Sequence, residues 1–266
     1  MHYRLLALLL LFQAHQQDPQ RHADALLLKV KGNWAVDNGP THQGMKLFYK
    51  QTLRLVDNKP GEVVVLYPTG EKRSCPDQER PVCTDLQVQE IVQKSNGVFG
   101  RIFSLLEDAF GPESRSVPGL TKAASIPDGI AEIRDAKIMI RTPGLPPGFA
   151  SRSYNLQFRR MGLDNALELP IEARYHWQPG TAFEATSVTP GFYRVNLLDA
   201  DSRPTGDYFL LLAYKAGKGG HVAEDFDALV AVTNAWGPRE QDDALLVRRR
   251  FLWKSAEELE LQEKPQ

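Results

Sequence analysis

The division of the apolar residues into short runs is the feature that most constrains the fold of this chain. Between residues 26 and 68 the runs are interrupted by clusters of Gly, Pro, Asn and Asp at 37–40 and 58–61. Residues 52–55 alternate between polar and apolar types, and residues 62–67 contain a continuous apolar run that should be covered on both faces. We therefore predict a small β-domain over residues 22–83.

The order of these runs is similar to that of a known family. Gly32 precedes Trp34-Ala35-Val36, Gly44 precedes Met45-Lys46-Leu47, and after Leu53-Arg54-Leu55 the run Val63-Val64-Val65-Leu66 leads to Pro68-Thr69-Gly70. This order resembles the FecR-like periplasmic β-domain over about 50 residues of the chain. The sequence departs from the family by having Thr-Gly instead of Asp-Gly at the last turn. The resemblance implies a β-module of an exported bacterial protein, used for sensing or binding; an unrelated β-meander would show a similar pattern.

The hydrophobic period changes after Cys83. Apolar residues then recur every three or four positions, at Val88, Ile91, Val92, Phe99, Ile102, Phe103, Leu106 and Phe110. Residues 84–87 have the form of a capping box, so we predict one amphipathic helix over residues 84–110. Because its charges are of mixed sign, packing on a neighbouring domain is favoured over binding to a membrane surface.

The rest of the chain predicts a second β-domain and two further helices. Residues 111–134 are rich in Pro, Gly and Ser and predict a linker. Short strand-like runs at even spacing over 135–216 predict an antiparallel β-sandwich, and apolar residues at helical spacing predict a helical hairpin over 217–262. The expected fold class is therefore mainly β with accessory helices.

The amino-terminal residues have the layout of a secretory signal peptide, which we place at residues 1–14. A basic start that includes Arg4 is followed by the apolar run from Leu5 to Phe12, which is too short for the roughly 30 Å hydrocarbon core of a membrane. We predict cleavage after Ala14, no transmembrane span in the mature chain, and a periplasmic or secreted location.

Cys75 and Cys83 are the only two cysteines, and we expect them to form one disulfide, as is usual in exported proteins. A metal or redox pair is the weaker alternative, because the spacing is not Cys-x-x-Cys and no second pair of ligands completes a zinc site. We expect no cofactor. The formal net charge of −1 gives no support for binding to nucleic acid.

Three parts of the sequence contain residue types found in phosphate, metal or anion sites, but none matches the known motif for such a site. The loop 217–221, Gly-Lys-Gly-Gly-His, lies between a predicted strand and a predicted helix but fits no phosphate-binding motif, so we expect a flexible connector. His176 has no partner at metal spacing and is expected to be a half-buried structural residue. Arg248-Arg249-Arg250 could bind an anionic polymer or a lipid head group, although a charged helix face that covers an aromatic residue is favoured.

These observations favour a non-catalytic binding, sensing or interaction module of the bacterial envelope. Its expected partner is another envelope protein or a polysaccharide. The alternative is an envelope hydrolase, with Glu184, Asp199 and Asp201 as candidate carboxylates, because such a pair cannot be recognised from one sequence. A deep pocket in the second domain with convergent acids of raised pKa would favour the hydrolase.

Overall fold

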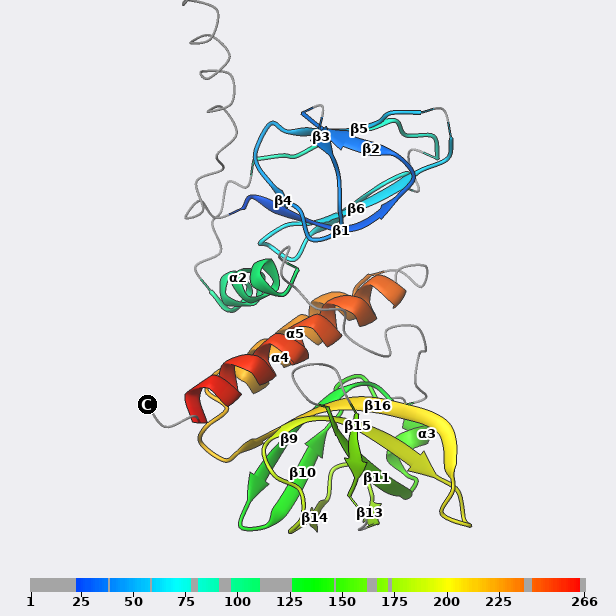
Figure 1. Ribbon diagram of the computed structural model, residues 1–266, viewed down its shortest axis with the longest axis vertical. Coiled ribbons are helices and arrows are strands. Elements are labelled where there is room, and N and C mark those ends of the chain that lie inside the picture. The colour runs from blue at the N-terminus through cyan, green and yellow to red at the C-terminus, as the bar shows by residue number, and fades with distance from the viewer. Residues whose placement is uncertain are drawn as a thin grey trace, which may run out of the picture.

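The chain folds into two β-units with a layer of helices between them (Figure 1). The computed structural model describes residues 23–37, 39–57, 59–77, 81–90, 97–110, 126–145, 147–161, 167–171, 174–236 and 241–263. The predicted signal peptide, with its cleavage site at Ala14, lies outside these residues, as does the predicted linker from 111 to 125. No described helix combines the length and the apolar character needed to cross a membrane.

The amino-terminal unit consists of two four-stranded antiparallel sheets, with strand orders β4-β1-β6-β7 and β3-β2-β5-β8. The strands are β1 (Ala25–Lys31), β2 (Trp34–Val36), β3 (Gly39–Pro40), β4 (Lys46–Leu47), β5 (Thr52–Leu55), β6 (Glu62–Leu66), β7 (Lys72–Cys75) and β8 (Asp85–Gln87). Leu27 and Val65 join Trp34 in the core of this unit, whereas Leu26 and Leu66 belong to the core beside the helices. The continuous apolar run of β6 is therefore covered on both faces, as its composition predicted.

The predicted disulfide joins Cys75 to Cys83 and closes the loop that follows β7. The helix that we expected over 84–110 begins only at Val98, as α2 (Val98–Ala109). Residues 85–87 form β8 instead, because Leu86 pairs with Leu53 of β5 and is buried in the core of the amino-terminal unit. Pairing with a distant strand thus overrides the local capping-box pattern.

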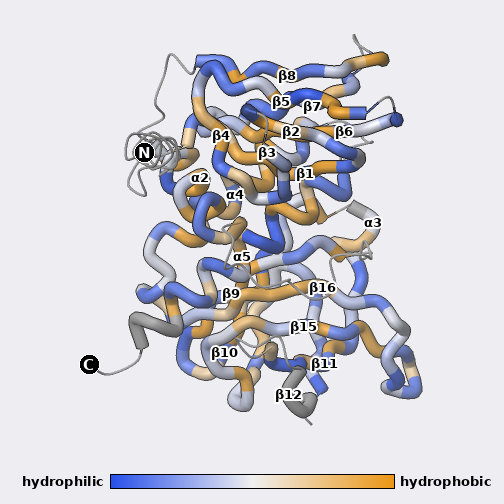
Figure 2. Tube along the Cα trace, turned by 45° about the horizontal axis from the view of Figure 1, so that its top comes forward, coloured by the Kyte–Doolittle hydropathy of each residue, from blue (hydrophilic) through white to orange (hydrophobic). Residues whose placement is uncertain are grey.

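The helix layer contains α2 and the predicted carboxyl-terminal hairpin, α4 (Val222–Asn234) and α5 (Gln241–Glu263). Its apolar side chains share one core with Leu28 of the amino-terminal unit and with Phe192 and Leu212 of the carboxyl-terminal unit. Figure 2 shows the strongly hydrophobic stretches of β1 and β16 in the two units. Because one core extends through all three layers, the helices hold the two β-units together.

The carboxyl-terminal unit is a single eight-stranded sheet that nearly closes on itself. Its order is β12-β11-β15-β16-β9-β10-β14, while β13 pairs with β11 and contacts β14. The strands are β9 (Gly129–Arg134), β10 (Lys137–Arg141), β11 (Tyr154–Met161), β12 (Leu167–Pro170), β13 (Tyr175–Trp177), β14 (Ala182–Glu184), β15 (Gly191–Leu198) and β16 (Pro204–Lys215), with the short helix α3 (Pro147–Ala150) after β10. The class of mainly β with accessory helices is confirmed. Where we expected an antiparallel sandwich, one curved sheet encloses Phe158, Trp177 and Phe209, and its β16–β9 pair is parallel.

The linker predicted over 111–134 is wrong over its last six residues, which form β9. This strand pairs with β10 on one side and with β16 on the other. A Cβ atom at Gly129 would lie 2.4 Å from the Arg141 carbonyl oxygen, so glycine is needed where the two backbones approach. Gly129, which contributed to the linker prediction, is thus the first residue of the central strand β9.

A buried ion pair connects the helix layer to this sheet. The side chains of Arg249 on α5 and Asp128 before β9 are 0% and 1% exposed, and Arg249 Nε donates to Asp128 Oδ2 at 2.7 Å. Asp128 Oδ1 accepts the backbone N–H of Leu210 on β16, also at 2.7 Å. The guanidinium lies 5.8 Å from the ring centre of Tyr208. The pair therefore fixes α5 against the centre of the sheet.

We predict that Asp128→Ala lowers the free energy of unfolding by about 3–5 kcal/mol, because it leaves a buried guanidinium without its partner. Asp128→Leu combined with Arg249→Met should recover part of this loss, since it removes both charges but still leaves the Leu210 N–H without its acceptor. Urea denaturation measures the change. Asp227→Ala, which removes the exposed partner of Arg141, is the control and should cost at most about 1 kcal/mol. An equal loss in Asp128→Ala and in the control would contradict the structural importance of the pair.

Candidate functional site

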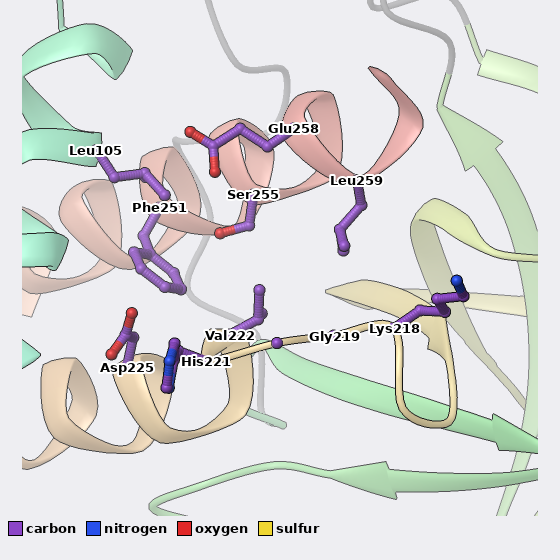
Figure 3. Close-up of a pocket in the computed structure, with 11 residues that line it drawn as sticks. Leu105, Lys218, Gly219, His221, Val222, Asp225, Phe251, Ser255, Glu258 and Leu259 are labelled. Atoms are coloured by element: carbon purple, nitrogen blue, oxygen red, sulfur yellow. The ribbon is translucent and has the colours of Figure 1, made fainter. Parts of the chain in front are cut away.

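The candidate site is a cavity of about 160 Å³ beside the start of α4, which we call the α4–α5 pocket (Figure 3). Its walls come from α2, from the loop between β16 and α4, from the first turn of α4 and from α5. The residues that line it are Leu105, Lys218, Gly219, Gly220, His221, Val222, Asp225, Phe251, Ser255, Glu258 and Leu259. The pocket therefore lies in the helix layer, where segments distant in the sequence meet.

Residues 218–221 of the loop 217–221, which was expected to be a flexible connector, form one wall of the pocket. The Lys218 N–H donates to the Lys215 carbonyl oxygen and the Val222 N–H to that of Gly219, both at 2.9 Å. Gly219 is buried, and a Cβ atom there would lie 2.4 Å from the ring of Tyr214. The loop thus follows a hydrogen-bonded path close to the sheet, and glycine permits the close approach.

The acidic residues in the first turn of α4 hold α2 in place. Arg101 of α2 donates to Asp225 through Nη2, at 2.6 Å from Oδ1, and through Nε, at 3.3 Å from Oδ2. Its Nη2 also lies 3.4 Å from Glu224 Oε2, which is 3.1 Å from His221 Nδ1. The hydrogen bond to Asp225 raises the pKa of Arg101. Acidic side chains are also favoured at a helix amino terminus by the helix dipole.

Phe251, Ser255 and Glu258 of α5 line the opposite wall. Their spacing of four and then three residues places them on one face of the helix. Ser255 is 1% exposed, and its Oγ has no hydrogen-bond partner within the part of the chain that the structure describes. Figure 3 shows this hydroxyl directed into the space between α5 and the start of α4. A buried polar group without a partner costs about 1–3 kcal/mol, so a hydrogen bond between this hydroxyl and a ligand would be favourable.

Glu258 brings a carboxylate to the exposed side of the pocket. Among the described residues it forms no salt bridge, because the neighbouring Lys254 is bridged to Glu257 at 3.3 Å. Desolvation raises the pKa of Glu258; Lys254 lowers it, while Asp108 and Glu257 raise it further. The pocket therefore contains a negative charge that the fold does not neutralise.

A second, more open groove of about 440 Å³ lies between the β6–β7 turn and the end of α4. It is lined by Thr69, Gly70, Glu71, Lys72, Val232, Ala235 and Trp236. Lys72 Nζ lies 5.0 Å from the centre of the Trp236 ring and 3.7 Å from Asp243 Oδ2. Since its charged group is already engaged in contacts between layers, this groove is a weaker candidate than the α4–α5 pocket.

In the arginine run 248–250 the central residue is buried and its two neighbours are half-buried. Arg249 forms the buried pair with Asp128. Arg248 Nε donates to Thr233 Oγ1 at 2.6 Å. Arg250 Nη1 donates to the Ala109 carbonyl oxygen at 3.3 Å, and its guanidinium lies 5.4 Å from the ring centre of Phe110. The favoured interpretation, in which the run covers an aromatic residue, agrees with the contact between Arg250 and Phe110.

The other candidates from the sequence are not brought into the pocket. His176 is exposed on β13 rather than half-buried, and its Nδ1 lies 3.4 Å from Asn155 Oδ1. Asp199 accepts the N–H of Arg203 at 2.8 Å within the β15–β16 loop, which also contains Asp201, while Glu184 is exposed on the edge strand β14. Within the described ranges, no three His, Cys, Asp or Glu side chains are grouped as metal ligands.

Sequence reasoning missed Ser255 and Glu258. The only signal was their spacing from Phe251, which is also the ordinary spacing of a packing helix. Comparison of the chain with family models, with curated proteins and with solved structures finds no significant match. The chemistry of the pocket therefore has to be derived from its own residues.

Glu258→Gln should stabilise the protein at neutral pH, because the raised pKa of Glu258 means that the fold disfavours the charged carboxylate. The raised pKa contributes stability below the unfolded-state pKa, and this contribution is lost as the pH rises through the folded-state pKa. The advantage of the variant should therefore grow from acidic toward neutral pH.

Urea unfolding of the wild type and the variant at a series of pH values measures this difference. Glu257→Gln is the matched control, because it removes the partner of Lys254 instead. A difference between Glu258→Gln and the wild type that stays constant with pH would contradict the prediction.

Proposed function

We propose that this protein is a non-catalytic binding module exported to the bacterial envelope, and that the α4–α5 pocket receives a group of its ligand or partner. The observation that carries the proposal is the buried Ser255 hydroxyl, which faces the pocket without a hydrogen-bond partner among the described residues. Buried polar groups are nearly always paired in folded proteins. Ser255 Oγ is one of several described side-chain atoms that depart from this rule, and the one that lines this pocket; a ligand atom that pairs with it would satisfy it.

The arrangement around Ser255 favours binding over catalysis. A serine nucleophile needs a base as its hydrogen-bond partner, and Ser255 Oγ has no such partner among the described residues. A hydrolase with two carboxylates needs both to be available, yet Asp225 is held by Arg101 at 2.6 Å. The pocket also lies in the helix layer rather than in the second β-unit.

The location rests on two features. The Cys75–Cys83 disulfide fits an oxidising compartment. The first 14 residues have the layout of a cleaved signal peptide, so the mature protein would work in the periplasm or outside the cell. On this proposal the amino-terminal unit is a FecR-like sensing or binding domain, and the partner is another envelope protein or a polysaccharide.

Export can be tested by expressing the full chain in a bacterial host and separating the periplasm and medium from the cytoplasm. The mature protein should be recovered outside the cytoplasm, with residue 15 at its amino terminus by mass spectrometry. Leu8→Arg, which interrupts the apolar run, is the control and should keep the uncleaved chain inside. Recovery of the wild type only as uncleaved cytoplasmic protein would refute export.

The role of the pocket can be tested by affinity capture from envelope fractions with mature protein as bait. Ser255→Leu should fill the space beside α5 and abolish capture of any partner that uses the pocket, whereas Asp199→Asn, in the distant hairpin loop, should retain it. Circular dichroism and the thermal midpoint establish whether the variants are folded, and Ser255→Ala serves as a second variant if Ser255→Leu is not. Undiminished capture by a folded pocket variant would contradict the proposed site.

A further inference from the structure

Some of the charged groups around the α4–α5 pocket have a salt-bridge partner and others do not. The Asp225 carboxylate has Arg101 at 2.6 Å, and the His221 ring nitrogen has Glu224 at 3.1 Å. The ammonium group of Lys218 points away from Ser255 and Glu258 in Figure 3. The Glu258 carboxylate, by contrast, makes no salt bridge within the described ranges. Lys218 and Glu258 are thus the two lining residues whose charges have no described salt bridge, and Glu258 is the one that lies a helical turn from Ser255.

The remaining wall is apolar. Leu105 from α2, Val222 from α4, and Phe251 and Leu259 from α5 line the space near Ser255. Phe251 is held in place by a stacked contact with Phe226, with ring centres 6.0 Å apart. An apolar wall suits a hydrocarbon stem, and a hydroxyl one helical turn from a carboxylate suits a group that donates several hydrogen bonds.

We propose that the α4–α5 pocket binds a primary ammonium group carried on a short apolar stem, with Glu258 and the Ser255 hydroxyl as acceptors. This inference rests on the proposed binding function and names its ligand class. An ammonium group has three donors and no acceptor, which matches a carboxylate and a hydroxyl oxygen. A carboxylate or phosphate ligand would instead be repelled by Glu258.

The size of the pocket agrees with this class. Its volume of about 160 Å³ leaves room for a small group such as an amine with a short hydrocarbon stem. n-Butylamine has five non-hydrogen atoms, and a lysine side chain carries the same ammonium and stem. Five atoms at the ceiling of about 1.5 kcal/mol each would give a Kd on the order of micromolar, and we expect the free amine to fall short of this ceiling, with a Kd on the order of millimolar.

The test is a titration of the isotope-labelled mature protein, followed by NMR, with three probes of equal length: n-butylamine, n-butanol and butyrate. n-Butylamine should shift the amide signals of Gly219, Gly220 and Ser255 in a saturable way, and butanol and butyrate should bind at least about tenfold more weakly, as the loss of a charge-assisted hydrogen bond predicts. Equal or tighter binding of butyrate or butanol would overturn the proposal, as would no saturable shift with n-butylamine.

Variants locate the interaction within the pocket. Glu258→Gln should weaken n-butylamine about tenfold and Ser255→Ala about threefold, in keeping with the loss of a charged and of a neutral hydrogen bond. Glu257→Gln changes the same charge on the adjacent residue, which already bridges Lys254, and should leave the Kd within about twofold. Equal effects of the two glutamine variants would refute the assignment to Glu258.

Titrations with two further amines identify the source of the ammonium group. Binding of Nα-acetyl-lysine methylamide with at least the affinity of n-butylamine would support a lysine side chain of a partner protein, whereas weaker binding would support a free amine. Tighter binding of glucosamine, which lacks the apolar stem, would overturn the stem requirement. If the envelope partner is lost in Ser255→Leu but no amine binds, the ligand class is wrong while the binding function stands.

Discussion

The buried pair of Arg249 and Asp128 determines where α5 lies, and α5 in turn organises the rest of the molecule. Asp128 accepts from both Arg249 and the Leu210 backbone, so it connects α5 to the central strands β9 and β16. From this position α5 packs against α2 and α4, and the shared core reaches β1 and β6 of the amino-terminal unit. A buried charged pair that is hydrogen-bonded within the protein thus lies where the helix layer meets the carboxyl-terminal sheet.

The same helix carries the pocket on another face. Leu252 and Ala256 are buried in the shared core, Ser255 and Glu258 line the pocket, and Phe251 belongs to both. Arg101 joins α2 to Asp225 at the start of α4, which fixes the facing wall. Because both walls belong to packed helices, the acceptors are held in position before a ligand arrives, and less conformational entropy is lost on binding.

Local patterns in the sequence predicted most strands, the two carboxyl-terminal helices and the disulfide. They failed where a distant partner decides the structure: Leu86 follows a helical pattern but pairs with Leu53, and Gly129 resembles a linker residue but begins a strand beside Arg141. The site was missed for a similar reason. Only the packing of α5 against α4 shows that Ser255 faces a cavity, because a serine at that spacing is ordinary on any helix.

Two of the buried polar sites, the Arg249–Asp128 pair and Ser255, differ in whether their hydrogen bonds are made within the protein. The Arg249–Asp128 pair is buried charge, but its hydrogen bonds are made within the protein, which is typical of a structural role. Ser255 is buried without a partner among the described residues, and Glu258 has no salt bridge there; both face the same space. Stability alone would favour alanine and glutamine at these two positions. Two unsatisfied acceptors that converge on one pocket are therefore better explained by a ligand than by the needs of the fold.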